Sequence, residues 1–347
     1  MTRRRLPPRL PVAQRALVGI AWAAAWMLAW GAALLFFANR AHAEPLSLAT
    51  SDGPVSLPIY VAEARGLFKA EGLDLRVVPC RSGRECLGLL DSGRADFATA
   101  AELLVALGAA DRPGRAIVAT LSASSYQIKI VARRSAHVLE APQVRGKRVG
   151  TVAGTSAQYF LDNWLVFNDV DPRSVAMVSL EPAQVTSALE RREVDAIAIW
   201  EPVASAAAAA LGTDAVTFAS PRVYTQHFNV VGERATIARR SDELARLLRA
   251  LIAAQRLIVA DPAGAQAVLA SRLGLTPAVA AGAMADQDYR VRLDQSLVTT
   301  MQSQARWAAR TGVASRPGAG PTSSDLLRTI DPAPLRRVAP DAVGLVR

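Results

Sequence analysis

The sequence of 347 residues has little of the chemistry that enzymes and metal proteins usually carry. It contains two cysteines, Cys80 and Cys86, and three histidines, of which His137 and His227 lie beyond the first 43 residues. Neither of these histidines has a partner at metal-ligand spacing, so the sequence predicts no metal site. Because no Gly-x-Ser-x-Gly elbow or other nucleophile–base pattern is present, we expect no catalytic residues, no cofactor and no enzymatic activity.

Acidic residues are also few in relation to basic ones, and the net charge is +10. Six arginines and no acidic residue fall within residues 1–43, so the other 304 residues carry a net charge of only +4. A net positive charge this small outside residues 1–43 gives no reason to expect a nucleic-acid partner.

The first 43 residues are typical of an export signal. A basic start precedes an apolar run, 16–38, and the small residues Ala41 and Ala43 stand where signal peptidase accepts them, before Glu44. The run is also long enough to span a bilayer, so residues 1–43 are either a signal peptide or an N-terminal membrane anchor. Both alternatives predict an exported, periplasmic chain, held at the inner membrane if the leader is not cleaved.

The two cysteines have five residues between them. In an oxidising compartment, such a pair can close a small disulfide loop between Cys80 and Cys86. Two reduced thiols at the end of a strand are the alternative, and the sequence leaves both open.

After the leader, β-rich runs alternate with helical patterns, which is typical of an α/β fold with mostly parallel sheets covered on both faces. The predicted strands are Leu46–Thr50, Leu73–Pro79, Ala95–Thr99, Ala116–Ser122, Gln127–Arg133, Arg148–Val152, Val175–Leu180, Asp195–Trp200, Ala215–Ala219 and Phe228–Gly232. From Ser241 onward, the pattern is almost wholly helical.

The first five and the last five of these predicted strands repeat one pattern. The spacing of Leu90, Asp96 and Glu102 recurs 99 residues later in Leu189, Asp195 and Glu201. We therefore predict a lobe 1 of residues 44–133 plus 234–347, with the C-terminal helices, and a lobe 2 of residues 134–233. Crossings at 133–141 and 232–236 would make a hinged, two-lobed clamshell with the ligand in its cleft.

Candidate binding residues stand where strands end and helices begin. Thr155, Ser156 and Ala157 open a helix whose free N–H groups and dipole suit an anion, although an ordinary helix cap is the alternative. Trp200 offers an apolar wall and Glu201 a partner for an amine; the alternative is that both serve the core and the next helix start. The full predicted set is Ser51, Pro54, Ser82, Thr99, Glu102, Ser122, Thr155, Ser156, Ala157, Trp200 and Glu201.

Four segments together resemble one family. They are residues 58–68 followed by Glu71-Gly72-Leu73, residues 146–150 at the beginning of a predicted strand, residues 154–157 at the beginning of a predicted helix, and residues 200–202 at the end of a predicted strand. This pattern is similar to solute-binding proteins of nitrate, sulfonate and taurine ABC importers, which are NMT1/THI5-like proteins.

The resemblance implies a type II periplasmic binding fold that captures a small anionic or zwitterionic ligand and presents it to an ABC permease in the inner membrane. It also implies ligand contacts from 155–157 and from Trp200 and Glu201, and we expect a monomer. The loop 80–86 is more charged than the family pattern, so Arg81 or Arg84 would add anion affinity.

Two other functions remain as alternatives. One is an enzyme of the pyrimidine or thiamine-precursor type that uses the same fold. The predicted export signal argues against this enzyme alternative. The other is a membrane-tethered ligand sensor, which gains weight if the leader is not cleaved.

Overall fold

A computed structural model of the chain describes residues 44–313 and 322–346. The predicted signal peptide or anchor, 1–43, lies outside the described residues. Within the described ranges, no single helix has the length and hydropathy needed to cross a membrane, and one sharply bent helix pair, Pro262–Leu273 with Pro277–Ala285, meets those criteria only jointly. Residues Leu46–Arg347 form one compact unit.

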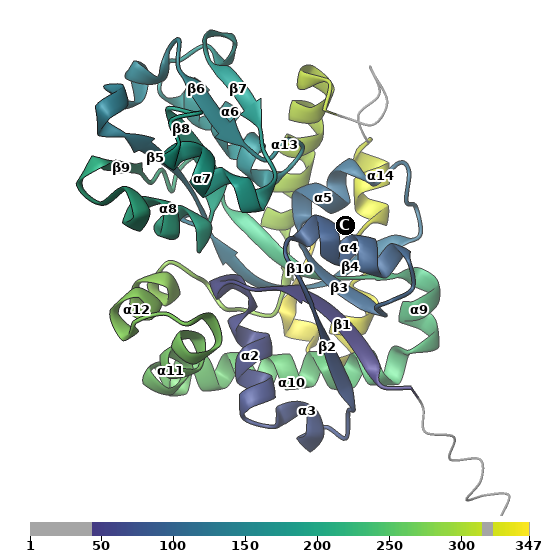
Figure 1. The fold of residues 1–347 in the computed structure, drawn as a ribbon. Coiled ribbons are helices and arrows are strands. Elements are labelled where there is room, and N and C mark those ends of the chain that lie inside the picture. Colours follow the sequence, from purple (N-terminus) through teal and green to yellow (C-terminus); the bar gives the residue numbers. More distant parts are fainter. Residues whose placement is uncertain (1–43, 314–321, 347) are drawn as a thin grey trace, which may run out of the picture. The chain divides into compact units, whose positions relative to one another are not determined.

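Two five-stranded mixed sheets organise this unit, and each defines a lobe (Figure 1). The lobe 1 sheet has the order β2-β1-β3-β10-β4, with β1 Leu46–Ser51, β2 Leu75–Cys80, β3 Phe97–Ala101, β4 Arg115–Ser124 and β10 Gln226–Glu233. The lobe 2 sheet has the order β7-β6-β8-β5-β9, with β5 Ile128–Arg133, β6 Arg148–Thr151, β7 Ala176–Ser179, β8 Ala196–Trp200 and β9 Ala215–Phe218. Both sheets place their strands in the same relative order, and the predicted α/β class is confirmed.

The crossings between the lobes differ from those expected at 133–141 and 232–236. Strand β5 pairs antiparallel with β8 and β9, so it belongs to lobe 2, while β10 pairs antiparallel with β3 and β4 and belongs to lobe 1. The chain therefore changes lobes one strand earlier each time, between β4 and β5 and between β9 and β10. The reason is that each crossing strand completes the sheet it enters, and strand propensity does not tell which sheet a strand joins.

Helices cover both sheets. Those of the two α/β lobes are α2 Leu57–Ala64, α3 Leu67–Ala70, α4 Gly83–Asp91, α5 Glu102–Leu107, α6 Ser156–Phe167, α7 Val185–Glu190 and α8 Val203–Leu211. The C-terminal helices are α9 Arg234–Arg239, α10 Ser241–Ala260, α11 Pro262–Leu273, α12 Pro277–Ala285, α13 Gln295–Thr311, α14 Ser323–Arg328 and α15 Ala333–Val338. The apolar face of α10, with Leu244, Leu248 and Leu251, is buried in the lobe 1 core, as its amphipathic pattern predicts.

The C-terminal region does more than cover lobe 1. Helix α13 packs on α5 of lobe 1 (Figure 1). Its Trp307 lies in the hydrophobic core of lobe 2, where Nε1 donates to Asp162 at 2.8 Å. Tyr159 of α6 also bonds Ser303 of α13 at 3.0 Å. Thus α13 is attached to both lobes.

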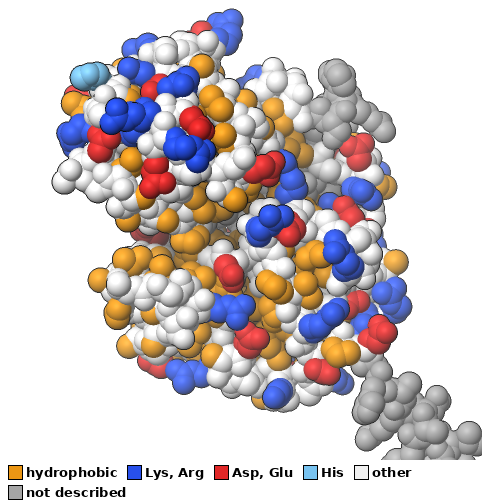
Figure 2. All heavy atoms as spheres, viewed as in Figure 1, with side chains coloured by type: hydrophobic (Ala, Val, Ile, Leu, Met, Phe, Trp, Pro, Cys, Tyr) orange, Lys and Arg blue, Asp and Glu red, His pale blue; other side chains and the backbone are white. Residues whose placement is uncertain are grey.

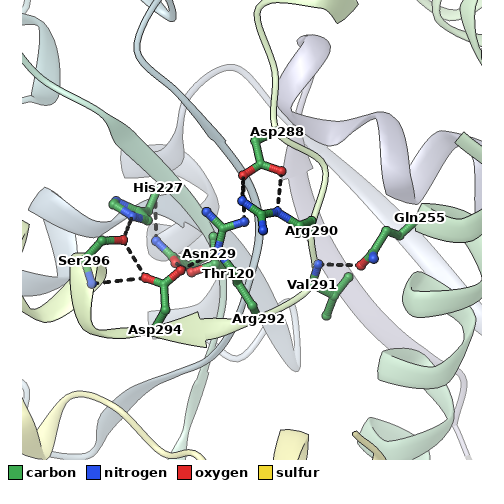
Figure 3. Close-up of polar contacts among 10 residues, drawn as sticks. All are labelled: Thr120, His227, Asn229, Gln255, Asp288, Arg290, Val291, Arg292, Asp294 and Ser296. Atoms are coloured by element: carbon green, nitrogen blue, oxygen red, sulfur yellow. Dashed lines mark hydrogen bonds and ion pairs between the residues drawn. The ribbon is translucent and has the colours of Figure 1, made fainter. Parts of the chain in front are cut away.

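The segment between α12 and α13 runs along the edge of the lobe 1 sheet. The N–H of Thr120 in β4 donates to the carbonyl of Arg292 in this segment at 2.8 Å, and the N–H of Arg292 donates to the carbonyl of Thr120 at 3.1 Å. Arg290 and Arg292 hold Asp288 (Figure 3), and although burial opposes this, their hydrogen bonds lower the pKa of that carboxyl group. These contacts hold the segment after α12 against β4, next to the point where the chain crosses into lobe 2.

Candidate functional site

A pocket of about 90 Å³ lies between the two lobes, and Figure 2 shows the groove between them. Lobe 1 lines it with Ser51, Asp52, Val55, Arg81, Ser82, Gly83, Arg84, Ala101, Leu104, Gln226 and Phe228. Lobe 2 and the crossing line it with Gln127, Val152, Thr155, Ser156, Glu181, Pro182, Trp200 and Glu201. Six predicted contacts are brought together here: Ser51, Ser82, Thr155, Ser156, Trp200 and Glu201.

Two helices begin at this pocket, one from each lobe. Ser82 caps α4, and its Oγ accepts from the N–H of Glu85 at 3.3 Å. Thr155 caps α6, where its Oγ1 accepts from the N–H of Ala157 at 3.3 Å and donates to the carbonyl of Val152 at 2.7 Å. Such helix starts carry partial positive charge and free N–H groups, so together they favour an anion in the pocket.

Ser156 is the first residue of α6, is 5% exposed and lines the pocket. Its Oγ forms no hydrogen bond with another described residue, whereas the hydroxyl of Thr155 is occupied within its own loop. Ser156 is therefore the hydroxyl on the lobe 2 side that remains available to a ligand.

Two arginines of the loop between β2 and α4 also line the pocket. Arg81 pairs with Glu85 at 2.8 Å, within its own loop. Arg84 instead reaches lobe 2, where Nη2 donates to the carbonyl oxygens of Ala153 and Gly154 at 2.8 and 3.3 Å. A disulfide joins Cys80 to Cys86 at the two ends of this loop, so of the two alternatives left by the sequence the structure has the disulfide.

The carboxylate of Glu201 has internal partners. Lys129 Nζ lies 2.7 Å from Oε1, and the hydroxyl and N–H of Ser205 donate at 2.8 and 3.0 Å. Lys129 Nζ also lies 3.9 Å from Oδ2 of Asp286 in lobe 1. Burial raises the pKa of the Asp286 carboxyl, the nearby Glu201 raises it further, and the charge of Lys129 opposes this shift. Glu201 thus lines the pocket as one half of an ion pair. Trp200 forms the adjoining wall and packs against two groups of buried apolar residues in lobe 2, one with Phe160 and Trp164 and the other with Ile197 and Ile199.

Removing Lys129 should destabilise the fold because it leaves the nearly buried Glu201 carboxylate without its cation. We expect Lys129→Met to cost about 2–3 kcal/mol in the free energy of unfolding, somewhat less than for a fully buried pair. The double variant K129M/E201Q should be less destabilised than the sum of its single variants, with a coupling of about 1–2 kcal/mol. Urea unfolding measures all three; additive losses would show that the two side chains do not act as a pair.

Five predicted contacts lie outside the pocket lining: Pro54, Thr99, Glu102, Ser122 and Ala157. Thr99 donates to Thr50 at 2.9 Å, Ser122 donates to the carbonyl of Val55 at 2.9 Å, and the carbonyl of Pro54 accepts from Tyr289 at 3.0 Å. Ala157 is fully buried in the first turn of α6. These groups serve the inside of their own lobes because strand-end position alone does not set the direction of a side chain.

Glu102, the predicted contact equivalent to Glu201 in the repeat, is completely buried away from the pocket. Its carboxylate accepts from Tyr224 Oη at 2.5 Å, from Gln304 Nε2 at 2.6 Å and from the N–H of His227 at 2.9 Å. Burial and this carboxylate raise the pKa of Tyr224 well above its usual value, so the phenol stays a donor. Glu102, at the start of α5, therefore ties α5 to the beginning of β10 and to α13.

Sequence reasoning missed the pocket residues Gln127, Gln226 and Phe228. Gln127 and Gln226 stand where the two crossing strands begin, and each crossing passes beside the cleft. Placing the crossings one strand later removed this signal. In the described part of the chain, no three His, Cys, Asp or Glu side chains gather as a metal site would require.

Comparisons with known proteins follow this geometry. The family model described as NMT1/THI5 like matches residues 53–265, more than half of the chain. A protein of Brucella abortus (strain 2308) named "Putative binding protein" is 24% identical over 143 residues, which are 41% of this chain and 43% of that protein. The match therefore spans less than half the length of the curated relative.

Solved structures share the fold. The periplasmic aliphatic sulphonate-binding protein SsuA of Escherichia coli superposes with a TM-score of 0.70 at 17% identity, covering 83% of this chain and 92% of that one. The periplasmic nitrate-binding protein NrtA of Synechocystis PCC 6803 gives a TM-score of 0.68 at 14% identity, covering 86% and 88%. At such low identity, the likeness shows the fold alone, which is the periplasmic binding protein fold.

Proposed function

The chain belongs to the NMT1/THI5-like family, and we propose that it is the solute-binding component of an ABC importer. It captures a small oxyanion or zwitterion in the pocket between its lobes and delivers it to a permease in the inner membrane. The similar sulphonate-binding and nitrate-binding structures support this proposal. The protein acts in the periplasm as a monomer, exported by the segment 1–43.

The observation that carries the proposal is the meeting of two helix starts, one from each lobe, at a single small pocket. The N-termini of α4 and α6 supply N–H groups and dipoles, and Ser82 and Ser156 supply hydroxyls. These donors are held in place before the ligand arrives, and apolar walls such as Trp200 and Phe228 lower the local dielectric. An anion bound there replaces its hydration shell with fixed donors.

The charged residues around the pocket further limit which classes of ligand can bind there. Glu201 and Glu102 have internal partners, so neither is a spare carboxylate for an amine. A zwitterion such as taurine would place its amine near Asp52 or Glu181, which line the pocket and, unlike Glu201 and Glu102, are exposed. A simple sulfonate or nitrate needs only the helix starts and the arginine loop.

A thermal-shift panel tests the proposal with methanesulfonate, taurine, nitrate, bicarbonate and a thiamine precursor. An anion at about 100 times its Kd adds about 2.7 kcal/mol of stability, which raises Tm by about 5 °C. We expect at least one small anion to do so and to be recovered unchanged. A folded protein that no anion stabilises would overturn the proposal, and a chemically altered ligand would point to the enzyme alternative.

A further inference from the structure

We propose that Arg84, held by the Cys80–Cys86 disulfide, is a latch that keeps the two lobes closed and thereby sets the lifetime of the bound ligand. The latch is defined by the Arg84 guanidinium on lobe 1 and the carbonyl oxygens of Ala153 and Gly154 on lobe 2. For its ligand, the inference rests on the proposed function; the contact between the lobes does not depend on it.

The disulfide lies where the chain leaves the edge of the lobe 1 sheet. Cys80 ends β2, which is an edge strand paired only with β1, so the chain leaving it has no second neighbouring strand to hold it. Cys86 lies in the first half of α4 and is fully buried. Closing this short loop removes most of its alternative conformations. Four of the five enclosed residues, 81–84, line the pocket, so the disulfide fixes one wall of the site.

Arg84 extends from α4 to lobe 2. A cation in the first turn of α4 faces the positive end of its own helix dipole, which disfavours it there. Arg84 forms no ion pair with a described residue, and both of its hydrogen bonds to described residues go to lobe 2. Hydrogen bonds from a charged guanidinium are stronger than neutral ones, so this contact between the lobes is stronger than a neutral hydrogen bond would be at the same exposed position.

Gly154 fits the other half of the latch. Its φ is +66°, a conformation that favours glycine, and a Cβ built there would lie 3.2 Å from Arg84 Nη2. A side chain at this position would therefore press on the guanidinium. Glycine lets the arginine reach both carbonyl oxygens.

The latch lies beside the residues that open the two helices at the pocket. On lobe 2, Ala153 and Gly154 directly precede Thr155 and Ser156, which open α6 at the pocket. On lobe 1, Arg84 follows Ser82 and Gly83, which open α4 at the same pocket. Each loop thus carries one half of the latch and one set of ligand donors, so the lobe separation at which the latch forms is also the one at which both helix starts reach the ligand.

The experiment compares Arg84→Ala and Arg84→Lys with Arg94→Ala, a charge-matched control that lies on lobe 1 outside the pocket lining and bonds Ser92. Small-angle scattering without ligand should show R84A more open than the wild type, R84K between them, and R94A unchanged. The dissociation rate of methanesulfonate, or of nitrate if only nitrate binds, should rise about tenfold in R84A and less than threefold in R84K.

A double-variant cycle tests the role of the disulfide. C80S/C86S should open the lobes and speed dissociation as R84A does, and adding R84A to it should change little further, since both act through one contact. Identical scattering for R84A and wild type would overturn the latch, whatever binds. Independent, additive effects of the two changes would overturn the role of the disulfide. If no anion binds but R84A still opens the lobes, the latch stands and the proposed function fails.

Discussion

Replacing Ser156 with aspartate should strongly weaken anion binding while leaving the protein folded. The new carboxylate occupies the start of α6, where Ser156 lines the pocket and its Oγ forms no hydrogen bond with another described residue. Two like charges about 4 Å apart repel by about 4 kcal/mol at an effective dielectric constant of about 20. We therefore expect the affinity to fall at least 100-fold.

Stability should change little. A negative charge in the first turn of a helix gains about 0.3–1 kcal/mol from the helix dipole, and desolvation of the carboxylate at this nearly buried position opposes that gain, so the Tm of S156D should stay close to that of the wild type. Ser156→Asn is the matched control, because it adds nearly the same volume without charge and should weaken binding less than tenfold. Titration calorimetry and thermal melts separate the two effects. Equal affinities for S156D and S156N would contradict an anion at the start of α6.

The largest loss of stability is expected from Glu102→Ala. This substitution leaves three buried donors, Tyr224 Oη, Gln304 Nε2 and the N–H of His227, without their shared acceptor. Each unsatisfied buried group costs about 1–3 kcal/mol, and partial rearrangement of the phenol reduces the sum, so we expect a loss of about 3–5 kcal/mol. For a chain of this size, that lowers Tm by about 6–12 °C.

Glu102→Gln is the matched variant for this network. It keeps the shape and one acceptor oxygen but turns a donor toward groups that are themselves donors, so it should cost about 1–2 kcal/mol. If E102A and E102Q both melt at the temperature of the wild type, the network does not hold α5, β10 and α13 together. Anion affinity in E102Q should stay close to that of the wild type, because Glu102 does not line the pocket.

Local signals in the sequence predict part of this site. The caps Ser82 and Thr155 stand between a strand and an apolar helical pattern, and such caps depend on residues within three or four positions. The repeated spacing around Glu102 and Glu201 correctly indicates two lobes with one strand order. Periodicity and capping are short-range properties, so they survive without knowledge of the fold.

Long-range partners were beyond the sequence. Glu201 and Glu102 occupy equivalent places in the repeat, yet one pairs with Lys129 of β5 and the other with Gln304, which is 202 positions away. The sheets that accept β5 and β10 are likewise settled by pairing between distant strands. Because these contacts form only when the lobes and α13 come together, no local pattern encodes them.

The most direct test of the account is a crystal structure of the protein grown with the most stabilising anion of the panel. The account predicts the anion between the N-termini of α4 and α6, with its oxygens within hydrogen-bond distance of Ser156 and Ser82. An anion bound at any other place in the molecule, or held in the pocket without contact to either helix start, would contradict it.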